Sequence, residues 1–269
     1  MREVIQLKAD DLRKCQDLAV DRDWPLEDVK WRLLFDIGAA YGIPDGDALA
    51  ACTVLTKLDT VAAVSMVLVA SRFGRQGLGR RIMTHVLEQA EGRLTLLHAT
   101  PYGRPLYESL GFGVAGGVVV HRGTIAGLPS GDTREANSAD HAAIRALDRR
   151  AWGADRGVLL DRLLMGHVRV AEHNGEIAGY AVGSDHGHET MIGPILAADE
   201  RMATALASDT ARAAGGPVRI DADVRAEVMQ AALRQAGLTP RLPATPMMVR
   251  GQMPGDEKLR YAPAMQALG

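Results

Sequence analysis

The stretch Phe73-Gly74-Arg75-Gln76-Gly77-Leu78-Gly79-Arg80 follows an apolar segment, 61–70, and precedes an amphipathic segment, 80–90. Glycine has no side chain, so successive backbone N–H groups of this turn can point into one concavity. A helix that begins at Gly79 or Arg80 adds the partial positive charge of its N-terminus. The stretch therefore predicts a strand–turn–helix unit that binds an anion such as a pyrophosphate.

Two well-known phosphate loops do not match this turn. It lacks the Gly-Lys-Ser/Thr of a Walker A loop, and its glycines are not spaced as Gly-x-Gly-x-x-Gly. The alternative is a structural turn that uses glycine only for its backbone freedom. The coincidence of three glycines, a helix and four arginines favours the anion site. These arginines are Arg72, Arg75, Arg80 and Arg81.

Working outward from the turn, hydrophobic periodicity predicts alternating strands and helices in the first half of the chain. The predicted strands are 3–7, 49–55, 61–70, 94–98 and 114–121. The predicted helices are 10–19, a segment that follows Trp24-Pro25, 80–90 and 106–110. A stretch rich in glycine, proline and serine, 123–132, predicts a linker.

The residues after the linker repeat the first half weakly. Three pairs of landmarks are separated by 126 to 129 residues: Trp24 and Trp152, Gly46 and Gly175, Gly111 and Gly237. A nearly constant offset predicts two copies of one α/β unit. We therefore expect domains at 1–125 and 133–269, joined by a linker at 126–132. In the second copy we predict helices 140–151, 199–213 and 224–236, and strands 191–196, 218–220 and 247–249.

Composition excludes several classes of protein. The 269 residues carry a formal net charge of −2, without the basic excess of a general nucleic-acid binder. The longest apolar run, 61–70, falls short of the roughly 20 residues that a membrane helix needs. The first residues, Met1 to Val4, show no signal pattern, and two cysteines make no disulfide framework. We expect a soluble cytoplasmic protein, monomer or homodimer, with no nucleic-acid or membrane partner.

The glycine turn resembles the signature of the GNAT superfamily of N-acetyltransferases, a strand, then (Arg/Gln)-x-x-Gly-x-(Gly/Ala), then a helix. Gly77 and Gly79 match the two defining glycines, whereas Gly74 stands where the family has Arg or Gln. The family uses that position mainly for its backbone N–H. The resemblance implies an α/β (α+β) fold of tandem GNAT-like domains. Each has a mixed, mostly antiparallel central sheet with a splayed strand pair, flanked by helices.

The resemblance also implies an acetyl-CoA site. The pyrophosphate would lie on the turn, and the pantetheine on exposed backbone of the preceding splayed strand. The residues that the resemblance assigns to this site are Val67, Val69, Gly74, Arg75, Gln76, Gly77, Leu78, Gly79 and Arg80. It implies acetyl-CoA as co-substrate and no metal.

A second segment, His98 to Phe112, resembles the later motif of the family, in which a Leu-Tyr pair precedes Leu-Gly-Phe. Tyr107 holds the position of the family's usual general acid. When an amine attacks a thioester, coenzyme A leaves as a thiolate whose conjugate acid has a pKa of about 8.5. A phenol with a pKa of about 10 is protonated at neutral pH and can donate to it. The alternative for Tyr107 is plain packing under its helix.

The second copy lacks these features. The segment that corresponds to the glycine turn, 196–201, contains no glycine and adds two carboxylates, which repel a pyrophosphate. The position that corresponds to Tyr107 falls near Leu233, which has no proton to donate. We expect one active site per chain, and a second half that resembles the degenerate half of two-domain members.

Removal of a proton from the acceptor amine needs a base, and the sequence leaves this base open. Asp221 ends an apolar strand, and His98 ends the matching strand in the first copy. The alternatives are an N-cap role for Asp221 or Asp223, a structural role for His98, and water relayed to a carboxylate. Further candidates are His121, Glu108 and Asp23.

Three other features have two interpretations each. Trp24 either covers the acceptor or packs in the core. The cluster Asp185-His186-Gly187-His188-Glu189 suggests a metal site by composition, but its place in a predicted turn favours solvated side chains. The final segment, 251–269, either folds back over the cleft or stays loose.

The predicted function is transfer of acetyl from acetyl-CoA to a primary amine of a small molecule, by direct attack in a ternary complex. One alternative is a non-catalytic acyl-CoA-binding regulatory module. The other is a protein N-acetyltransferase, although a nearly neutral chain offers no obvious docking patch for a basic protein tail.

Overall fold

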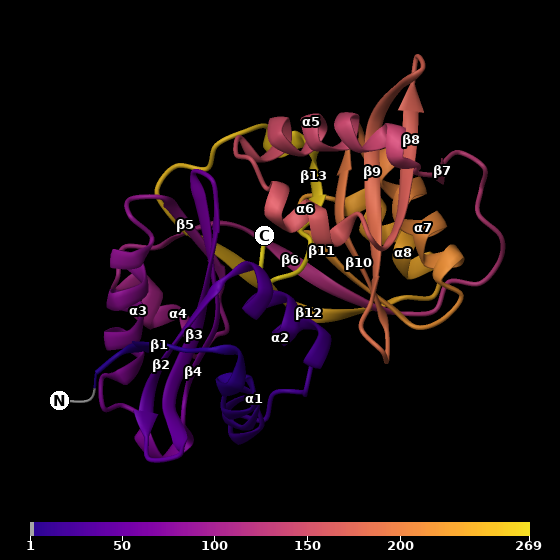
Figure 1. Ribbon diagram of the computed structural model, residues 1–269. Helices are drawn as coiled ribbons and strands as arrows, with labels where there is room; N and C mark the ends of the chain where they lie inside the picture. The colour runs from indigo at the N-terminus through magenta and orange to yellow at the C-terminus, as the bar shows by residue number, and fades with distance from the viewer. Residues whose placement is uncertain (1–2) are drawn as a thin grey trace.

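The strands of both halves join in one mixed, mostly antiparallel sheet with helices on both faces (Figure 1). The computed structural model describes residues 3–269, so Met1 and Arg2, the start of the first predicted domain, lie outside the described residues. The strands before the predicted linker are β1 (Ile5–Gln6), β2 (Ala39–Asp45), β3 (Ala48–Leu58), β4 (Val61–Val69), β5 (Leu94–His98) and β6 (Gly113–Gly123). Those after it are β7 (Arg134–Glu135), β8 (His167–His173), β9 (Glu176–Asp185), β10 (Thr190–Ala197), β11 (Val218–Asp223), β12 (Thr239–Arg250) and β13 (Arg260–Ala262).

The helices follow the predicted order. They are α1 (Leu12–Asp21), α2 (Asp28–Ile37), α3 (Leu78–Gln89), α4 (Arg104–Glu108), α5 (His141–Trp152), α6 (Gly157–Leu163), α7 (Glu200–Ala214) and α8 (Glu227–Gln235). The predicted start of the last helix at Val224 is wrong. Strand β11 continues its pairing with β6 through Asp223, opposite Val118, so α8 begins only at Glu227.

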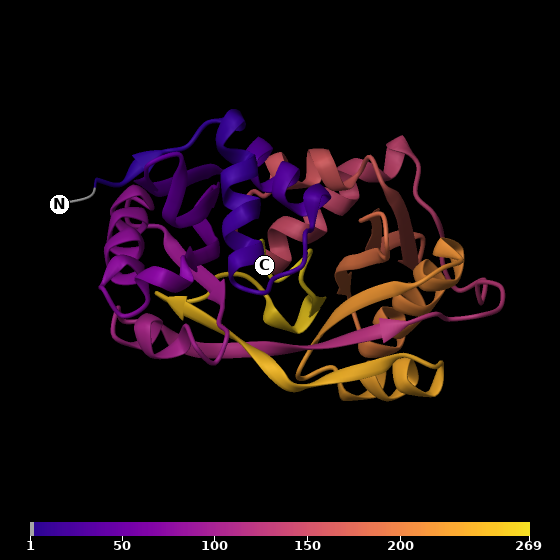
Figure 2. The same ribbon diagram turned by 90° about the horizontal axis from the view of Figure 1, so that it is seen from below.

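Strands β6 and β12 exchange places between the two halves. The order across the middle of the sheet is β5-β12-β6-β11, so β12 of the second half lies between two strands of the first. Met247 of β12 pairs with His98 of β5, and Val120 of β6 pairs with Asp221 of β11. Figure 2 shows β6 and β12 running side by side along the molecule. Neither half therefore has a complete sheet of its own.

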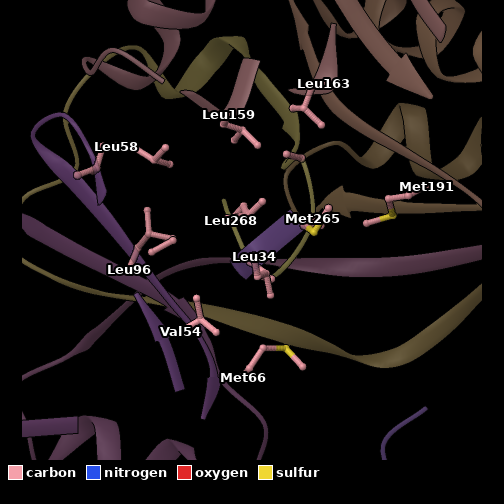
Figure 3. Close-up of a cluster of buried hydrophobic side chains, with 14 of the residues drawn as sticks. Leu34, Val54, Leu58, Met66, Leu96, Leu159, Leu163, Met191, Met265 and Leu268 are labelled. Atoms are coloured by element: carbon pink, nitrogen blue, oxygen red, sulfur yellow. The ribbon is translucent and has the colours of Figure 1, made fainter. Parts of the chain in front are cut away.

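One face of the sheet is covered by α1, α2, α5 and α6, and we call it the shared face. Its core takes side chains from both halves, among them Leu34 of α2, Leu159 of α6 and Leu268 of the C-terminal segment (Figure 3). On the opposite face, α3 and α4 cover the first half while α7 and α8 cover the second. Strand β4 is largely buried on both faces, which explains why all of its residues except Ser65 are apolar.

Each half contains a pair of parallel strands that diverge. Strands β4 and β5 pair only from Val61 opposite Leu94 to Ala63 opposite Leu96. Beyond this point β4 carries a bulge, where Met66 has a left-handed φ of 52°. Strands β10 and β11 likewise pair only over three residues of each strand. We call the place where β4 and β5 diverge the opening. The chain leads from this end of β4 to the glycine turn.

The predicted linker, 126–132, forms a loop tied to the second half. The backbone N–H and the hydroxyl of Ser130 both donate to the carboxylate of Asp209 in α7, and the Thr133 hydroxyl donates to the same group. The domain limits remain a prediction, since the shared sheet crosses them. Among residues 3–269, no helix is both long and apolar enough to span a membrane.

Replacement of Met248 by alanine tests the shared sheet. Met248 of β12 has no exposed surface and packs among first-half side chains, including Met83 and Leu97. We expect Met248→Ala to lower the free energy of unfolding by about 2–5 kcal/mol, because it leaves a cavity. The loss should shift one transition, measured in urea by circular dichroism and by tryptophan fluorescence.

The control is Met165→Ala at a side chain that is 81% exposed, which should change the free energy by less than about 0.5 kcal/mol. Two separate transitions, of which Met248→Ala shifts only one, would contradict the shared sheet.

Candidate functional site

The glycine turn leaves the start of α3 without a side-chain cap. Gly77 is the N-cap residue, with a left-handed φ of 78°, and a Cβ added there would meet no atom within 4 Å. The first N–H groups of a helix have no partner within the helix, and here no side chain accepts from the cap position. Gly79 lies close to its neighbours, since a Cβ there would come within 3.2 Å of Leu106. The two glycines thus provide an open concavity and close packing of α3.

Gly74, the position that departs from the family signature, does not need to be a glycine. Its φ is −54°, and an added Cβ would lie 3.5 Å from the Ser71 carbonyl oxygen, an ordinary contact. Side chains of many kinds fit there. The departure therefore leaves the backbone of the turn unchanged.

Arginines surround the turn at the surface. Arg72 forms an ion pair of 2.6 Å with Asp45 and lies over the Phe73 ring, and Arg80 donates to the Ser109 hydroxyl at 2.7 Å. Arg75 is exposed on the turn itself, with a φ of 59°. An open hollow of about 540 Å³ continues from Gly77 along α3. The arrangement is a positively charged approach to the helix N-terminus.

Val67 and Val69 lie on β4 beyond its last pair with β5. Both are partly exposed, whereas most of the strand is buried. Their strand still pairs with β3 on its other edge, where Val69 is opposite Ala51. The edge toward β5 is the one that borders the opening.

Tyr107 of α4 lies in the core of the first half, on the face of the sheet that α3 and α4 cover. Its side chain is 7% exposed, and its ring packs edge-on against Phe112 at 6.1 Å. Among residues 3–269, no side-chain hydrogen bond of its hydroxyl is found. Burial raises the pKa of Tyr107 to about 12. The phenol is therefore a protonated donor at neutral pH.

His98 ends β5 at the opening. Its Nδ1 lies 2.9 Å from the carbonyl oxygen of Gln266. A carbonyl can only accept, so Nδ1 carries the hydrogen and Nε2 is left as an acceptor. Nε2 is buried and has no hydrogen-bond partner among the described residues. Burial lowers the pKa of His98, so the ring is neutral and Nε2 can take a proton.

Asp221 lies inside β11, fully buried on the shared face. Both of its oxygens accept from Arg219, at 2.8 and 3.0 Å, and Arg219 also lies 3.8 Å from Glu27 of α2. An N-cap role for Asp221 is excluded because α8 begins six residues later. Asp223 instead accepts from the backbone N–H of Arg225. The carboxylate of Asp221 is thus already held by an arginine.

The partners of Asp221 were not predicted from the sequence. Arg219 stands two residues before it, and residues two apart in a strand share a face, so this spacing was the available signal. Glu27, the N-cap residue of α2, forms an ion pair with Lys30 of α2 and approaches Arg219 from across the shared face. Burial lowers the pKa of Lys30. Glu27 and Arg219 are far apart in the sequence, so no local pattern predicts their contact.

Trp24 is partly buried and packs against the shared core. The histidine cluster forms the β9–β10 connection, where Glu189 accepts two hydrogen bonds from Arg122. Among residues 3–269, no group of three or more histidine, cysteine, aspartate or glutamate side chains is placed to hold a metal ion.

The corresponding site in the second half is filled by the chain itself. Asp199 caps α7 through the N–H of Met202, and Glu200 accepts from the first N–H groups of α8. The C-terminal segment folds back, and β13 pairs with β10 beyond the point where β10 and β11 diverge. The fit is so close that a Cβ at Gly193 would lie 2.1 Å from the Pro263 carbonyl oxygen. Both the helix N-terminus and the opening are therefore occupied.

Comparisons with known proteins agree with this architecture. Residues 5–112 match the acetyltransferase (GNAT) family, and residues 144–262 match an acetyltransferase (GNAT) domain. The chain is 26% identical over 230 residues, 81% of each sequence, to the uncharacterized N-acetyltransferase YitH of Bacillus subtilis (strain 168).

Solved structures share the fold. A protein of Pyrococcus horikoshii has a TM-score of 0.81 at 16% identity, over 99% of this chain and 95% of that one. A tandem GNAT protein from the clavulanic acid biosynthesis pathway has a TM-score of 0.65 at 14% identity, over 94% and 100%. A GCN5-related N-acetyltransferase from Sphaerobacter thermophilus has a TM-score of 0.62 at 16% identity, over 94% and 96%.

The raised pKa of Tyr107 can be measured directly. We expect the difference in phenolate absorbance between the wild type and Tyr107→Phe to titrate near pH 12, because burial disfavours the phenolate. The neutral phenol stabilises the fold below pH 10, and this contribution is lost as the pH rises through about 12. Absorbance is read immediately after a rapid pH jump, before alkaline unfolding. A difference that titrates at pH 10 would show an accessible hydroxyl.

Proposed function

We propose that this chain, which belongs to the GNAT superfamily and carries two GNAT domains in tandem, transfers acetyl from acetyl-CoA to a primary amine of a small molecule. The transfer would occur by direct attack in a ternary complex. The observation that supports this most is the contrast between the two halves. Strands β4 and β5 diverge beside a helix whose N-terminus has no side-chain cap, whereas in the second half β13 pairs with β10 beyond the point where β10 and β11 diverge.

The first half would hold acetyl-CoA. The uncapped N-terminus of α3 behind Gly77 suits the pyrophosphate, helped by the charges of Arg75 and Arg80. The free edge of β4 at Val67 and Val69 suits an extended pantetheine chain, which needs backbone partners. The remaining turn residues of the proposed site are Gly74, Gln76, Leu78 and Gly79.

Two side chains would move protons. Bound acetyl-CoA supplies an activated thioester, and attack by the amine forms a C–N bond while the C–S bond breaks. The Tyr107 hydroxyl would give its proton to the departing sulfur. The Nε2 atom of His98 would take the proton of the ammonium, because it is neutral and has no other partner. Asp221, held by Arg219, would act through its charge or through a water molecule.

The second half would shape the acceptor side. It supplies Asp221 and Arg219 from β11, opposite Glu27 of α2. Trp24 precedes α2 and is partly exposed, so it borders this region in the proposal. We infer one productive site per chain, with domains at 1–125 and 133–269 and a linker at 126–132.

Replacement of Gly77 tests acetyl-CoA binding. Gly77→Glu places a carboxylate where the pyrophosphate would lie, so we expect acetyl-CoA to lose its thermal stabilisation of the protein. Gly175→Glu is a matched control, because Gly175 has a φ of 79° and equally open surroundings, in the β8–β9 turn. Unchanged acetyl-CoA binding by Gly77→Glu would remove the site from this turn.

Replacement of Tyr107 tests the acid. Purified protein is given acetyl-CoA and a panel of amines, and free thiol is followed. On any acceptor found, Tyr107→Phe should lower kcat by about 10²–10⁴-fold at neutral pH while acetyl-CoA still binds. Tyr102→Phe, at a side chain that is 76% exposed, is the control and should keep wild-type activity. Full activity of Tyr107→Phe would show that another group protonates the thiolate.

A further inference from the structure

A cavity of about 230 Å³ lies on the shared face, and His98, at the end of β5, is one of its lining residues. Its floor is formed by β12 and β6, and its walls by the end of α5, the end of β11 and the C-terminal segment. Met247, Val249 and Met253 give it an apolar side. It has the space of about seven liquid water molecules of about 30 Å³ each.

Three residues that line this cavity each carry a buried polar atom without a hydrogen-bond partner among the described residues. These atoms are Nε2 of His98, Nε1 of Trp152 and Nη1 of Arg260. The three residues come from separate parts of the chain, yet all of them line the one cavity. Buried polar groups in folded proteins are usually paired, so three orphans at one place point to a missing partner.

The charges at the cavity are unevenly matched. Arg225 is paired with Asp223 at 2.8 Å and with Glu257 at 3.2 Å. Arg260 stacks on the Trp152 ring at 5.0 Å, and within residues 3–269 no carboxylate lies within 4 Å of its guanidinium nitrogens. Burial lowers the pKa of Arg260, which reflects a poorly solvated cation. An anionic group beside Arg260 would pair with this cation.

His98, which also lines the cavity, calls for a hydrogen-bond donor. Nδ1 of His98 is engaged by Gln266, so Nε2 can only accept. An ammonium group can supply such a donor, and its positive charge lies within reach of the negative ends of the Arg225 ion pairs on the same lining. One small molecule with a carboxylate, an ammonium and an apolar body meets all three requirements.

We propose that this cavity binds a small amino acid with an apolar side chain. Its carboxylate accepts from Arg260 Nη1 and Trp152 Nε1, and its ammonium donates to His98 Nε2. Its side chain packs on Met247 and Val249. Because the ammonium would meet the same His98 Nε2 atom that takes the proton in the proposed transfer, the assignment rests on the proposed function and names its acceptor. Calorimetry measures binding without transfer, so failure of the assignment is distinguishable from failure of the transfer.

Calorimetric titration of the full chain with alanine, valine, leucine and methionine tests the assignment. We expect at least one of the four to bind. The two matched probes for valine are valinamide, which lacks the carboxylate, and 3-methylbutanoate, which lacks the ammonium. Each should bind at least tenfold more weakly than the corresponding amino acid. No binding of any of the four amino acids, or equal binding of valinamide, overturns the proposal.

Two variants locate the site. Arg260→Met keeps the length of the side chain without its charge, and we expect at least tenfold weaker amino-acid binding. Trp152→Phe keeps an aromatic ring and removes the N–H, which should weaken binding severalfold, and it carries the test if Arg260→Met fails to fold. The control is Arg241→Met at an exposed arginine of β12. Wild-type affinity in a folded Arg260→Met or in Trp152→Phe contradicts the site.

Discussion

The pairing of β12 with β5 and β6 is the constraint on which the rest of the molecule depends. It places a strand of the second half inside the sheet of the first, so the two halves cannot rotate against each other without breaking backbone hydrogen bonds. The rigid sheet fixes His98 at the end of β5 relative to Asp221 in β11. Side chains from both halves can therefore lie at one site without a moving hinge.

The two halves each match a GNAT domain but differ where their parallel strands diverge. In the first half the strands diverge beside a helix whose N-terminus has no cap, and the positive end of that helix remains available. In the second half Asp199 caps the helix, and β13 supplies the missing strand edge. Strands that diverge leave backbone N–H and C=O groups without partners, which costs free energy. A bound ligand can offset this cost by forming hydrogen bonds with these groups. In the second half, β13 pairs with β10 and supplies such partners from the chain itself.

Local features could be predicted from the sequence, and distant pairings could not. The strand 94–98 has its predicted bounds, and the glycine turn was recognised because neighbouring residues define it. The central sheet with its splayed pairs followed from the family resemblance. The strand exchange was missed because β12 contains Pro240, Pro243 and Pro246, which argue against a strand inside a sheet.

Parts of the candidate site could not be predicted, because they depend on contacts between residues far apart in the sequence. Tyr107 and Gly77 lie in short motifs, whereas the hydrogen bond between His98 and Gln266 joins residues 168 positions apart. The fate of the C-terminal segment was left open, since a strand of three residues has too short a pattern to recognise. The capping role considered for Asp221 failed because strand pairing with β6 continued past it.

The position of β12 near the end of the chain has a consequence for biosynthesis. Strand β5 emerges from the ribosome long before its neighbour in the sheet, since its partner residues lie about 150 positions later (Met247 against His98). The first half must wait with an unpaired strand edge until nearly the whole chain has been made. Such long-range pairing slows folding and exposes an edge to other chains. Separate genes for the two halves would each encode an incomplete sheet.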